Sequence, residues 1–294
     1  MQNRLWSLLF ALCFTTFIAS PKAHAEMYFP YILANIPTQS VDDGIKQVSS
    51  RLTAAGFEIA GHYQVHKEAK VLIATSREQK ALATKSEQGG FGVATRISVT
   101  AVNGTVQIAY TDPRWMSHIY RLESDGIPLL NRLTAALGNQ NSFGSATGIE
   151  KDRLRKYQYM IFMPDFTDQV ELAEHGDHAS ALAAVEAGLL KGMGGTAKIY
   201  RIDIPGKEES LFGVACKQGE AADQAIMKII DKGEMKHTAH LPYDILVSGG
   251  KVLMLHGKFR IAQSFPDLGM GTFMEISSAP DAIAETLTKV ASGS

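Results

Sequence analysis

Two stretches of the chain share one pattern of apolar and polar positions. "VNGTVQIAY" (102–110) and "SGGKVLMLH" (248–256) each join two apolar, β-prone runs through a two-residue turn, Asn103-Gly104 or Gly249-Gly250. Such residue pairs accept a positive φ and favour tight hairpins. The pattern therefore predicts one β-hairpin in each half of the chain.

The segments upstream of the two hairpins also correspond. "VLIATSREQKAL" (71–82) and "LFGVACKQGEAA" (211–222) are each an apolar strand that runs into a polar helix start. This alignment sets Ser76 opposite Cys216. Strand followed by helix is therefore expected at the same place in both halves.

Each half is expected to begin with a strand and an amphipathic helix. The strands are "YILANI" and "YMIFM", and the helices are 41–55 and 178–191, each ended by glycine and followed by another strand. "IPLLNRLTAALG" and "APDAIAETLTKVASG" predict a closing helix in each half.

The order of elements predicts an α+β fold. Each half follows the scheme β-α-β(4)-α, and strands joined by hairpins form an antiparallel sheet with the helices packed on one face. We expect two tandem copies of this unit, 26–140 and 155–294. The glycine-rich, polar segment 141–154 is expected to link them.

Residues 1–25 have the features of a secretory signal peptide. A basic start at Arg4 precedes an apolar run from Leu5 to Ile18 and a small-x-small ending, which predicts cleavage before Glu26. The run is shorter than a bilayer span requires, and no later segment is long and apolar enough. We expect an exported protein, periplasmic or secreted, with no transmembrane anchor after cleavage.

Charge and cysteine content exclude further classes of partner and of covalent structure. The formal net charge is -1, and the loss of Arg4 and Lys22 with the signal makes the mature chain more acidic. A weakly acidic chain without basic clusters argues against nucleic acid as a partner. Loss of Cys13 leaves Cys216 unpaired, so no internal disulfide is expected.

Several short segments resemble one bacterial family, the domain of unknown function numbered 302. The second half carries the glycine-x-cysteine segment with one extra residue, as Gly213 to Cys216, and the Leu241-Pro242 pair that opens the next strand. The first half carries Asp112, Pro113 and Met116 in "GTVQIAYTDPRWM". The resemblance implies a fold similar to that of TATA-box-binding proteins, without their DNA function.

The chain also departs from the family pattern. Tyr243 stands where the family often has a second cysteine, and the first half lacks the cysteine altogether. The second half lacks Asp-Pro after its hairpin, although Met270 follows nearby. Each half has therefore kept a different part of the motif set, and the resemblance implies a fold more firmly than an activity.

Cys216 is the one candidate nucleophile. At a strand-to-helix junction, orphan N–H groups and the helix dipole stabilise a thiolate, which is a nucleophile or a soft metal ligand. The alternative is a small, buried, structural side chain, since free cysteine is among the most buried residues. No neighbour in sequence supplies a catalytic base.

A soft-metal site is a second hypothesis. Thiolate, imidazole and thioether groups together suit copper(I) better than magnesium or calcium. The second half supplies a candidate ligand set of Cys216, His237, His240, His256 and Met270. The competing interpretation is that the histidines are exposed polar residues and the methionine fills space in the core.

Enzyme signatures are otherwise missing from the sequence. There is no G-x-S-x-G, no P-loop and no dinucleotide-binding G-x-G-x-x-G after a strand. The favoured interpretation is a periplasmic, non-catalytic binding or accessory protein for a soft metal such as copper or for a small ligand. The alternatives are a thiol-dependent enzyme or redox protein using Cys216, and a purely structural or interaction module.

Overall fold

The computed structural model describes residues 25–293, and the predicted signal segment lies almost entirely outside them. The fold is α+β, with two large antiparallel sheets. The strand order is β3-β4-β5-β6-β2-β7 in the first sheet and β10-β11-β12-β13-β9 in the second. None of the helices in this part of the chain is long and apolar enough to cross a membrane.

The first half contributes the elements up to residue 154. Its strands are β1 (Met27–Tyr28), β2 (Tyr31–Leu33), β3 (Glu58–His66), β4 (Ala69–Thr75), β5 (Thr95–Val102), β6 (Thr105–Thr111), β7 (Asn141–Phe143) and β8 (Ile149–Glu150). Its α-helices are α1 (Val41–Ala54), α2 (Arg77–Ala83), α3 (Pro113–Ile119), α4 (Ile127–Leu137) and α5 (Lys151–Leu154).

The second half contributes the remaining elements. Its strands are β9 (Val170–Glu174), β10 (Thr196–Asp203), β11 (Glu209–Cys216), β12 (Tyr243–Ser248) and β13 (Lys251–Met254). Its α-helices are α6 (His178–Leu190), α7 (Asp223–Ile230), α8 (Gly257–Ala262), α9 (Met270–Glu275) and α10 (Ala279–Ser292).

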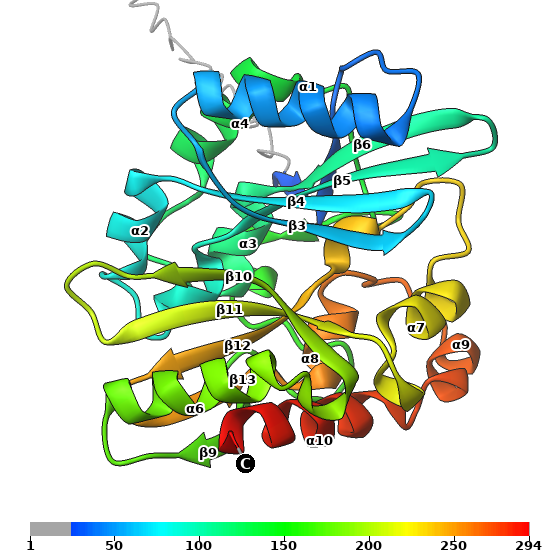
Figure 1. The fold of residues 1–294 in the computed structure, drawn as a ribbon. Helices are drawn as coiled ribbons and strands as arrows, with labels where there is room; N and C mark the ends of the chain where they lie inside the picture. The colour runs from blue at the N-terminus through cyan, green and yellow to red at the C-terminus, as the bar shows by residue number, and fades with distance from the viewer. Residues whose placement is uncertain (1–24, 294) are drawn as a thin grey trace, which may run out of the picture.

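Helices cover the outer sides of the two sheets, and the sheets lie next to each other. α1 and α4 lie on the side of the first sheet that faces away from the second half, whereas α6 and α10 cover the far side of the second sheet (Figure 1). The apolar stripe of α1, with Val48 and Leu52, packs against Leu72 of β4 and Ile97 of β5. Burying this stripe stabilises both layers.

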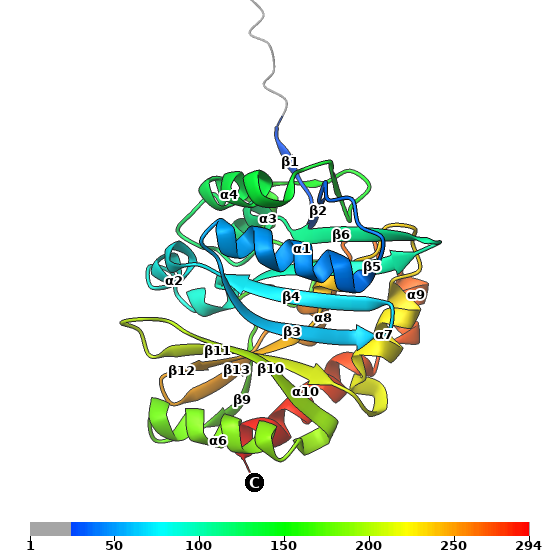
Figure 2. The same cartoon turned by 45° about the horizontal axis from the view of Figure 1, so that its top comes forward.

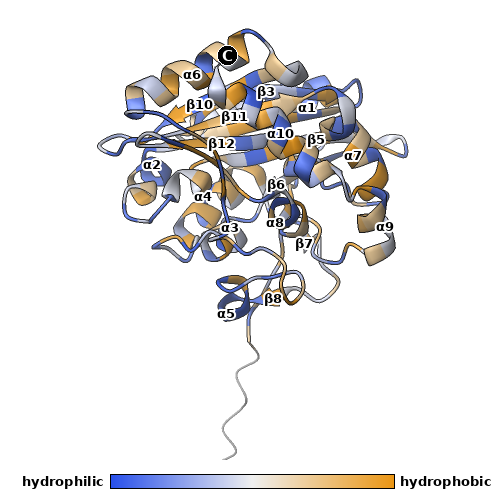
Figure 3. Cartoon of the chain, turned by 90° about the horizontal axis from the view of Figure 1, so that it is seen from below, coloured by the Kyte–Doolittle hydropathy of each residue, from blue (hydrophilic) through white to orange (hydrophobic). Residues whose placement is uncertain are grey.

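The sheets meet where β3 lies beside β10. A Cβ atom on Gly61 of β3 would lie 2.4 Å from the backbone oxygen of Ile199 in β10, so only glycine allows this approach. The central strands β11 and β12 are largely apolar, whereas α5 is polar (Figure 3). One core cluster contains buried residues of both halves, such as Ile73 and Tyr200, so the halves are joined through a mainly buried contact.

Both predicted hairpins are confirmed. Val102 pairs with Thr105 across Asn103-Gly104, and Ser248 pairs with Lys251 across Gly249-Gly250. The helices predicted at 41–55 and 178–191 are also present, as α1 and α6. Glycine-containing turns and apolar periodicity therefore located these elements correctly.

The ladder register differs from the sequence alignment of the two halves. When residues are counted along the paired strands from each hairpin turn, Cys216 in the second sheet corresponds to Ala74 in the first. Ser76 lies two residues further on, where it caps α2. The alignment missed this because matching apolar runs does not fix the register between neighbouring strands.

One predicted strand is wrong. "YMIFM" forms an exposed turn in which Ile161 and Phe162 are 80% and 98% exposed, and β9 supplies the strand instead. Phe162 has φ of 69°, which no strand residue adopts. An apolar run alone does not specify a strand when no neighbouring strand pairs with it.

The structure adds three helices after the hairpins that the sequence analysis did not predict. α3 begins at Pro113, with the carboxylate of Asp112 accepting from the Arg114 N–H at 2.9 Å, and α8 begins after His256. α9 follows α8. The predicted linker also contains regular structure: β7 at its start pairs with β2, and β8 and α5 lie at its end.

Candidate functional site

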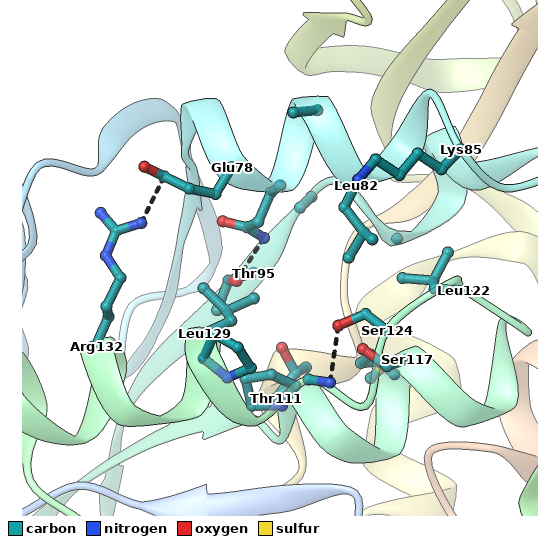
Figure 4. Close-up of a pocket in the computed structure, with 18 residues that line it drawn as sticks. Glu78, Leu82, Lys85, Thr95, Thr111, Ser117, Leu122, Ser124, Leu129 and Arg132 are labelled. Carbon is teal, nitrogen blue, oxygen red and sulfur yellow. Dashed lines mark hydrogen bonds and ion pairs between the residues drawn. The ribbon is translucent and has the colours of Figure 1, made fainter.

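A cavity of about 330 Å³ lies in the first half, between α2 on one side and α3 and α4 on the other (Figure 4). Its walls come from α2, the segment before β5 and its first residue, the end of β6, α3, α4 and the α3–α4 connection. The lining residues are Glu78, Gln79, Ala81, Leu82, Lys85, Gly92, Ala94, Thr95, Thr111, Pro113, Met116, Ser117, Leu122, Ser124, Gly126, Pro128, Leu129 and Arg132.

Local capping fixes the helices that form the walls. The hydroxyl of Ser76 accepts from the Gln79 N–H at 3.3 Å and so starts α2. Gly126 precedes α4 with φ of 75°, and a Cβ atom there would lie 2.3 Å from the backbone oxygen of Pro113. Glycine therefore allows α4 to begin directly against the start of α3.

Most of the cavity wall is apolar. Leu82 comes from α2, Met116 from α3, Leu129 from α4, and Leu122 from the connection between α3 and α4. The volume is at the lower end of the range for small-molecule sites, which are mostly apolar with a few polar groups that fix orientation. The cavity has the size and lining expected for a small organic molecule.

Hydroxyl groups supply the polar part of the wall. Thr95 accepts from the side-chain amide of Gln79 at 3.0 Å, and Thr111 accepts from the Arg96 N–H at 3.3 Å. Neither hydroxyl donates to an acceptor among residues 25–293, and the same holds for Ser117 and Ser124, which also line the cavity. These hydroxyls can therefore donate to oxygen atoms of a bound molecule.

One buried acceptor beside the cavity also lacks a partner. Gln79 Oε1 makes no hydrogen bond within the described part of the chain, although its Nε2 is bonded to both Val93 O and Thr95 Oγ1. A buried polar atom without a partner costs free energy. Gln79 is therefore a candidate acceptor for a ligand N–H or O–H group.

Charged side chains lie at both ends of the cavity. Glu78 and Arg132 form an ion pair at 2.6 Å at one end, and Lys85 lies at the other (Figure 4). The pKa of Glu78 is lowered by its own backbone N–H and by hydrogen bonds from Arg132 and Ser76. Arg132 also lies over the ring of Phe57, with 4.5 Å between Cζ and the ring centroid, which holds it at this rim.

The structure buries Cys216, and its surroundings do not favour the thiolate that a nucleophile requires. It is the last residue of β11, 1% exposed, and its backbone N–H donates to Asp223 Oδ2 at 3.0 Å. Burial, and then the nearby Asp223 carboxylate, raise the pKa of the thiol well above its usual value. The thiol is therefore shielded, as expected for a buried structural cysteine.

The histidines of the predicted metal set have other partners. The His237 ring contacts Asp231 Oδ1 at 3.0 Å and lies 4.7 Å from the Phe265 ring centroid. His240 lies between the Tyr243 hydroxyl and the Arg260 guanidinium, at 3.2 and 3.0 Å. Burial, and then Arg260, lower the pKa of His240 well below its usual value.

The remaining two members of the set also serve local structure. His256 caps α8, its Nδ1 accepting from the Lys258 N–H at 3.2 Å, and Met270 begins α9 with 42% of its surface exposed. Within residues 25–293, no group of three or more His, Cys, Asp or Glu side chains is placed to hold a metal ion. The histidines and the cysteine of the predicted ligand set therefore do not come together in one such centre. That set was Cys216, His237, His240, His256 and Met270.

Sequence reasoning identified only a small part of the cavity. Pro113 and Met116, which belong to the family-like motif of the first half, both line it. The other wall residues come from segments up to about fifty positions apart, and no local pattern marks them. The helix cap at Asp112 was the signal that could have predicted α3.

Comparison with known proteins gives one structural neighbour. The chain is similar to a crystal structure described as the uncharacterized conserved protein DUF302 from Bacillus stearothermophilus, with 16% sequence identity and a TM-score of 0.33. The similarity covers 38% of this chain and 97% of that one. No protein-family model matches the chain, and no curated protein matches it.

Proposed function

We propose that this chain is a non-catalytic binding protein whose cavity in the first half holds a small, mainly apolar molecule that carries oxygen acceptors. The observation behind this proposal is the 330 Å³ cavity with its apolar wall and its hydroxyls that lack acceptors. Leu82, Met116 and Leu129 would contact the apolar body. Thr95 and Thr111 would donate to its oxygen atoms.

Binding of a neutral apolar dye tests this proposal. N-phenyl-1-naphthylamine should increase in fluorescence when it enters the cavity of the purified protein. Leu129→Trp fills the cavity and should abolish the increase, whereas Ile127→Trp adds the same ring to α4 at an exposed position outside the lining and should not. Equal dye binding by both variants would contradict the proposal.

Native mass spectrometry then tests for a natural ligand. Protein taken directly from its expression host should carry a small molecule in the wild type and in Ile127→Trp, and should lose it in Leu129→Trp. A metal ion that remains bound in the wild type and in both variants would favour the metal hypothesis instead.

The thiol-dependent alternative has less support. A nucleophilic cysteine requires an accessible thiol with a lowered pKa. Cys216 is buried, and both burial and Asp223 raise its pKa. We therefore favour a binding function over thiol chemistry at Cys216.

We also propose that the two halves are copies of one family-302-like unit in an exported chain. The equivalent strand orders, β3-β4-β5-β6-β2 and β10-β11-β12-β13-β9, support the duplication. Superposition of the halves in a crystal structure tests it, and a different path of the chain through the two sheets would contradict it. Export predicts that the N-terminal residue of protein recovered from the periplasm or medium is Glu26.

A further inference from the structure

A groove of about 930 Å³ lies between the two halves, on the side where α7 approaches β3. Figure 2 shows α7 beside the end of β3. The β3–β4 hairpin and β5 form one wall, and the end of β11, α7 and the segment that follows α7 form the other. The groove shares no lining residue with the cavity described above.

Four lysines line this groove: Lys217, Lys228, Lys232 and Lys236. Within residues 25–293, Lys217, Lys228 and Lys236 form no ion pair with a carboxylate, and Lys236 donates instead to the backbone oxygen of Asp231 at 2.9 Å. Lys232 lies 4.0 Å from Glu275, and both side chains are more than half exposed. Such an exposed contact compensates little of the lysine charge.

The two carboxylates in the groove wall do not neutralise these lysines. Asp231 points to His237, accepting from its backbone N–H at 3.0 Å and contacting its ring at 3.0 Å. Glu68 lies 3.9 Å from Lys67, which does not line the groove. The groove therefore carries an excess of positive charge.

This excess is local, because the chain as a whole is weakly acidic, with a formal net charge of -1. A cleft lined by charges of one sign concentrates the field and attracts ligands of opposite charge. Lysine binds phosphate-type groups as a point charge. The groove is also much larger than a single phosphate ion. Lys217 precedes α7, Lys228 lies in its last turn, and Lys232 and Lys236 follow it.

We propose that this groove binds a ligand with several phosphate or sulfate groups. The lysines contact the anionic groups, and the hydroxyl-bearing and apolar parts of the wall, such as Thr238 and Met227, contact the body that joins them. The site is independent of the cavity in the first half, so each can be tested without the other.

Isothermal titration calorimetry with tripolyphosphate in metal-free, low-salt buffer tests the proposal. The double variant Lys228→Ala, Lys232→Ala should bind about tenfold more weakly than the wild type, because each contact between charged groups at a solvent-exposed site is worth up to about 1 kcal/mol. Both lysines are exposed, so the fold should be preserved. Circular dichroism checks this.

A matched control separates the groove from general charge effects. Lys46→Ala, Lys289→Ala removes the same charge from exposed positions outside the groove and should bind within about twofold of the wild type. Parallel titrations with sucrose octasulfate show whether phosphate or sulfate groups bind more tightly, and binding of either supports the proposal. Absence of binding for both probes, or an equal loss in the control variant, would overturn it.

Discussion

The Tyr63 hydroxyl donates a 2.6 Å hydrogen bond to Asp223 Oδ2 and so connects β3 of the first half to the start of α7 in the second. Asp223 Oδ2 also accepts from the Cys216 N–H, while Asp223 Oδ1 has no partner within residues 25–293. Burial raises the pKa of Asp223 to about 7, against the lowering effect of these hydrogen bonds and of Arg260. An acid that titrates near neutral pH therefore lies between the halves.

The stability of the protein should consequently fall as the pH rises from about 4 to about 7. The folded-state pKa of Asp223 is above the unfolded value of 3.8, so the folded state binds the proton more tightly. The contribution of Asp223 is fully present below the unfolded pKa and is lost as the pH passes the folded pKa. The loss is on the order of 4 kcal/mol.

Urea unfolding at pH 5, 7 and 8.5 measures this effect. Asp223→Asn keeps an acceptor for Tyr63 and Cys216 but carries no charge, so it should be more stable than the wild type at pH 8.5 and should lose most of the pH dependence in this range. The titratable or charged groups that interact with Asp223 are Tyr63, Cys216, Tyr243 and Arg260. An unchanged pH dependence in the variant would assign the effect to other residues.

A second contact between the halves is the buried ion pair of Arg96 in β5 and Asp244 in β12. The Tyr200 hydroxyl donates to the other oxygen of Asp244 at 2.5 Å. Arg96→Met leaves the buried Asp244 carboxylate with only the more distant Arg260 guanidinium, whose Nε is 4.0 Å away, and should cost about 3 kcal/mol. Asp244→Asn leaves the Arg96 guanidinium buried without its counter-charge and should cost a similar amount, although Asn still accepts from Tyr200.

A double-mutant cycle checks this interpretation. The variant with both changes should be more stable than the sum of the two single losses predicts, because neither charge of the pair remains to be left without its partner. Strictly additive losses in chemical denaturation would mean that the two side chains do not interact energetically.

Gly213 lies in the middle of the buried strand β11, and a close neighbour explains why this position is a glycine. A Cβ atom at this position would lie 1.9 Å from Cε1 of Tyr200, the residue that hydrogen-bonds Asp244. Gly213→Ala should therefore displace the Tyr200 ring and lower the free energy of unfolding by about 1–3 kcal/mol.

A second glycine provides the control. Gly271 lies in α9, where an added methyl group would meet no neighbouring atom within 4 Å, so Gly271→Ala should be neutral or stabilise the protein by up to about 1 kcal/mol. Thermal unfolding of the two variants compares them directly. A stable Gly213→Ala protein would show that β11 and Tyr200 can separate without cost.

The sequence predicted the fold better than it predicted the sites. Hairpins and helices depend on local signals, such as Asn103-Gly104 and the apolar spacing of α1, and these elements are present. The turn at Ile161 and Phe162 was missed because an apolar run normally indicates burial. Whether such a run is covered depends on distant parts of the chain.

Both candidate sites depend on contacts that are remote in sequence. The sequence shows no basic cluster, yet the fold brings Lys217 and Lys236 into one groove. Lys228 lies in α7, whereas Lys232 and Lys236 follow its end at Ile230, so their four-residue spacing in the sequence is not a helical repeat and did not mark the groove. The cavity needed α3, which the sequence analysis did not include.

The last prediction concerns the unpaired thiol. Cys216 is 1% exposed, and burial together with Asp223 raises its pKa, so native protein at pH 8 should react with a maleimide reagent at least about 100-fold more slowly than unfolded protein. A second variant, Cys216→Ala with Lys289→Cys, places an exposed thiol on α10 and should react rapidly while folded. Mass spectrometry of timed samples measures both rates. Because burial is the larger cause of the raised pKa, Asp223→Asn should leave Cys216 slow to react, whereas fast labelling of native wild-type protein would return the thiol-dependent hypothesis to consideration.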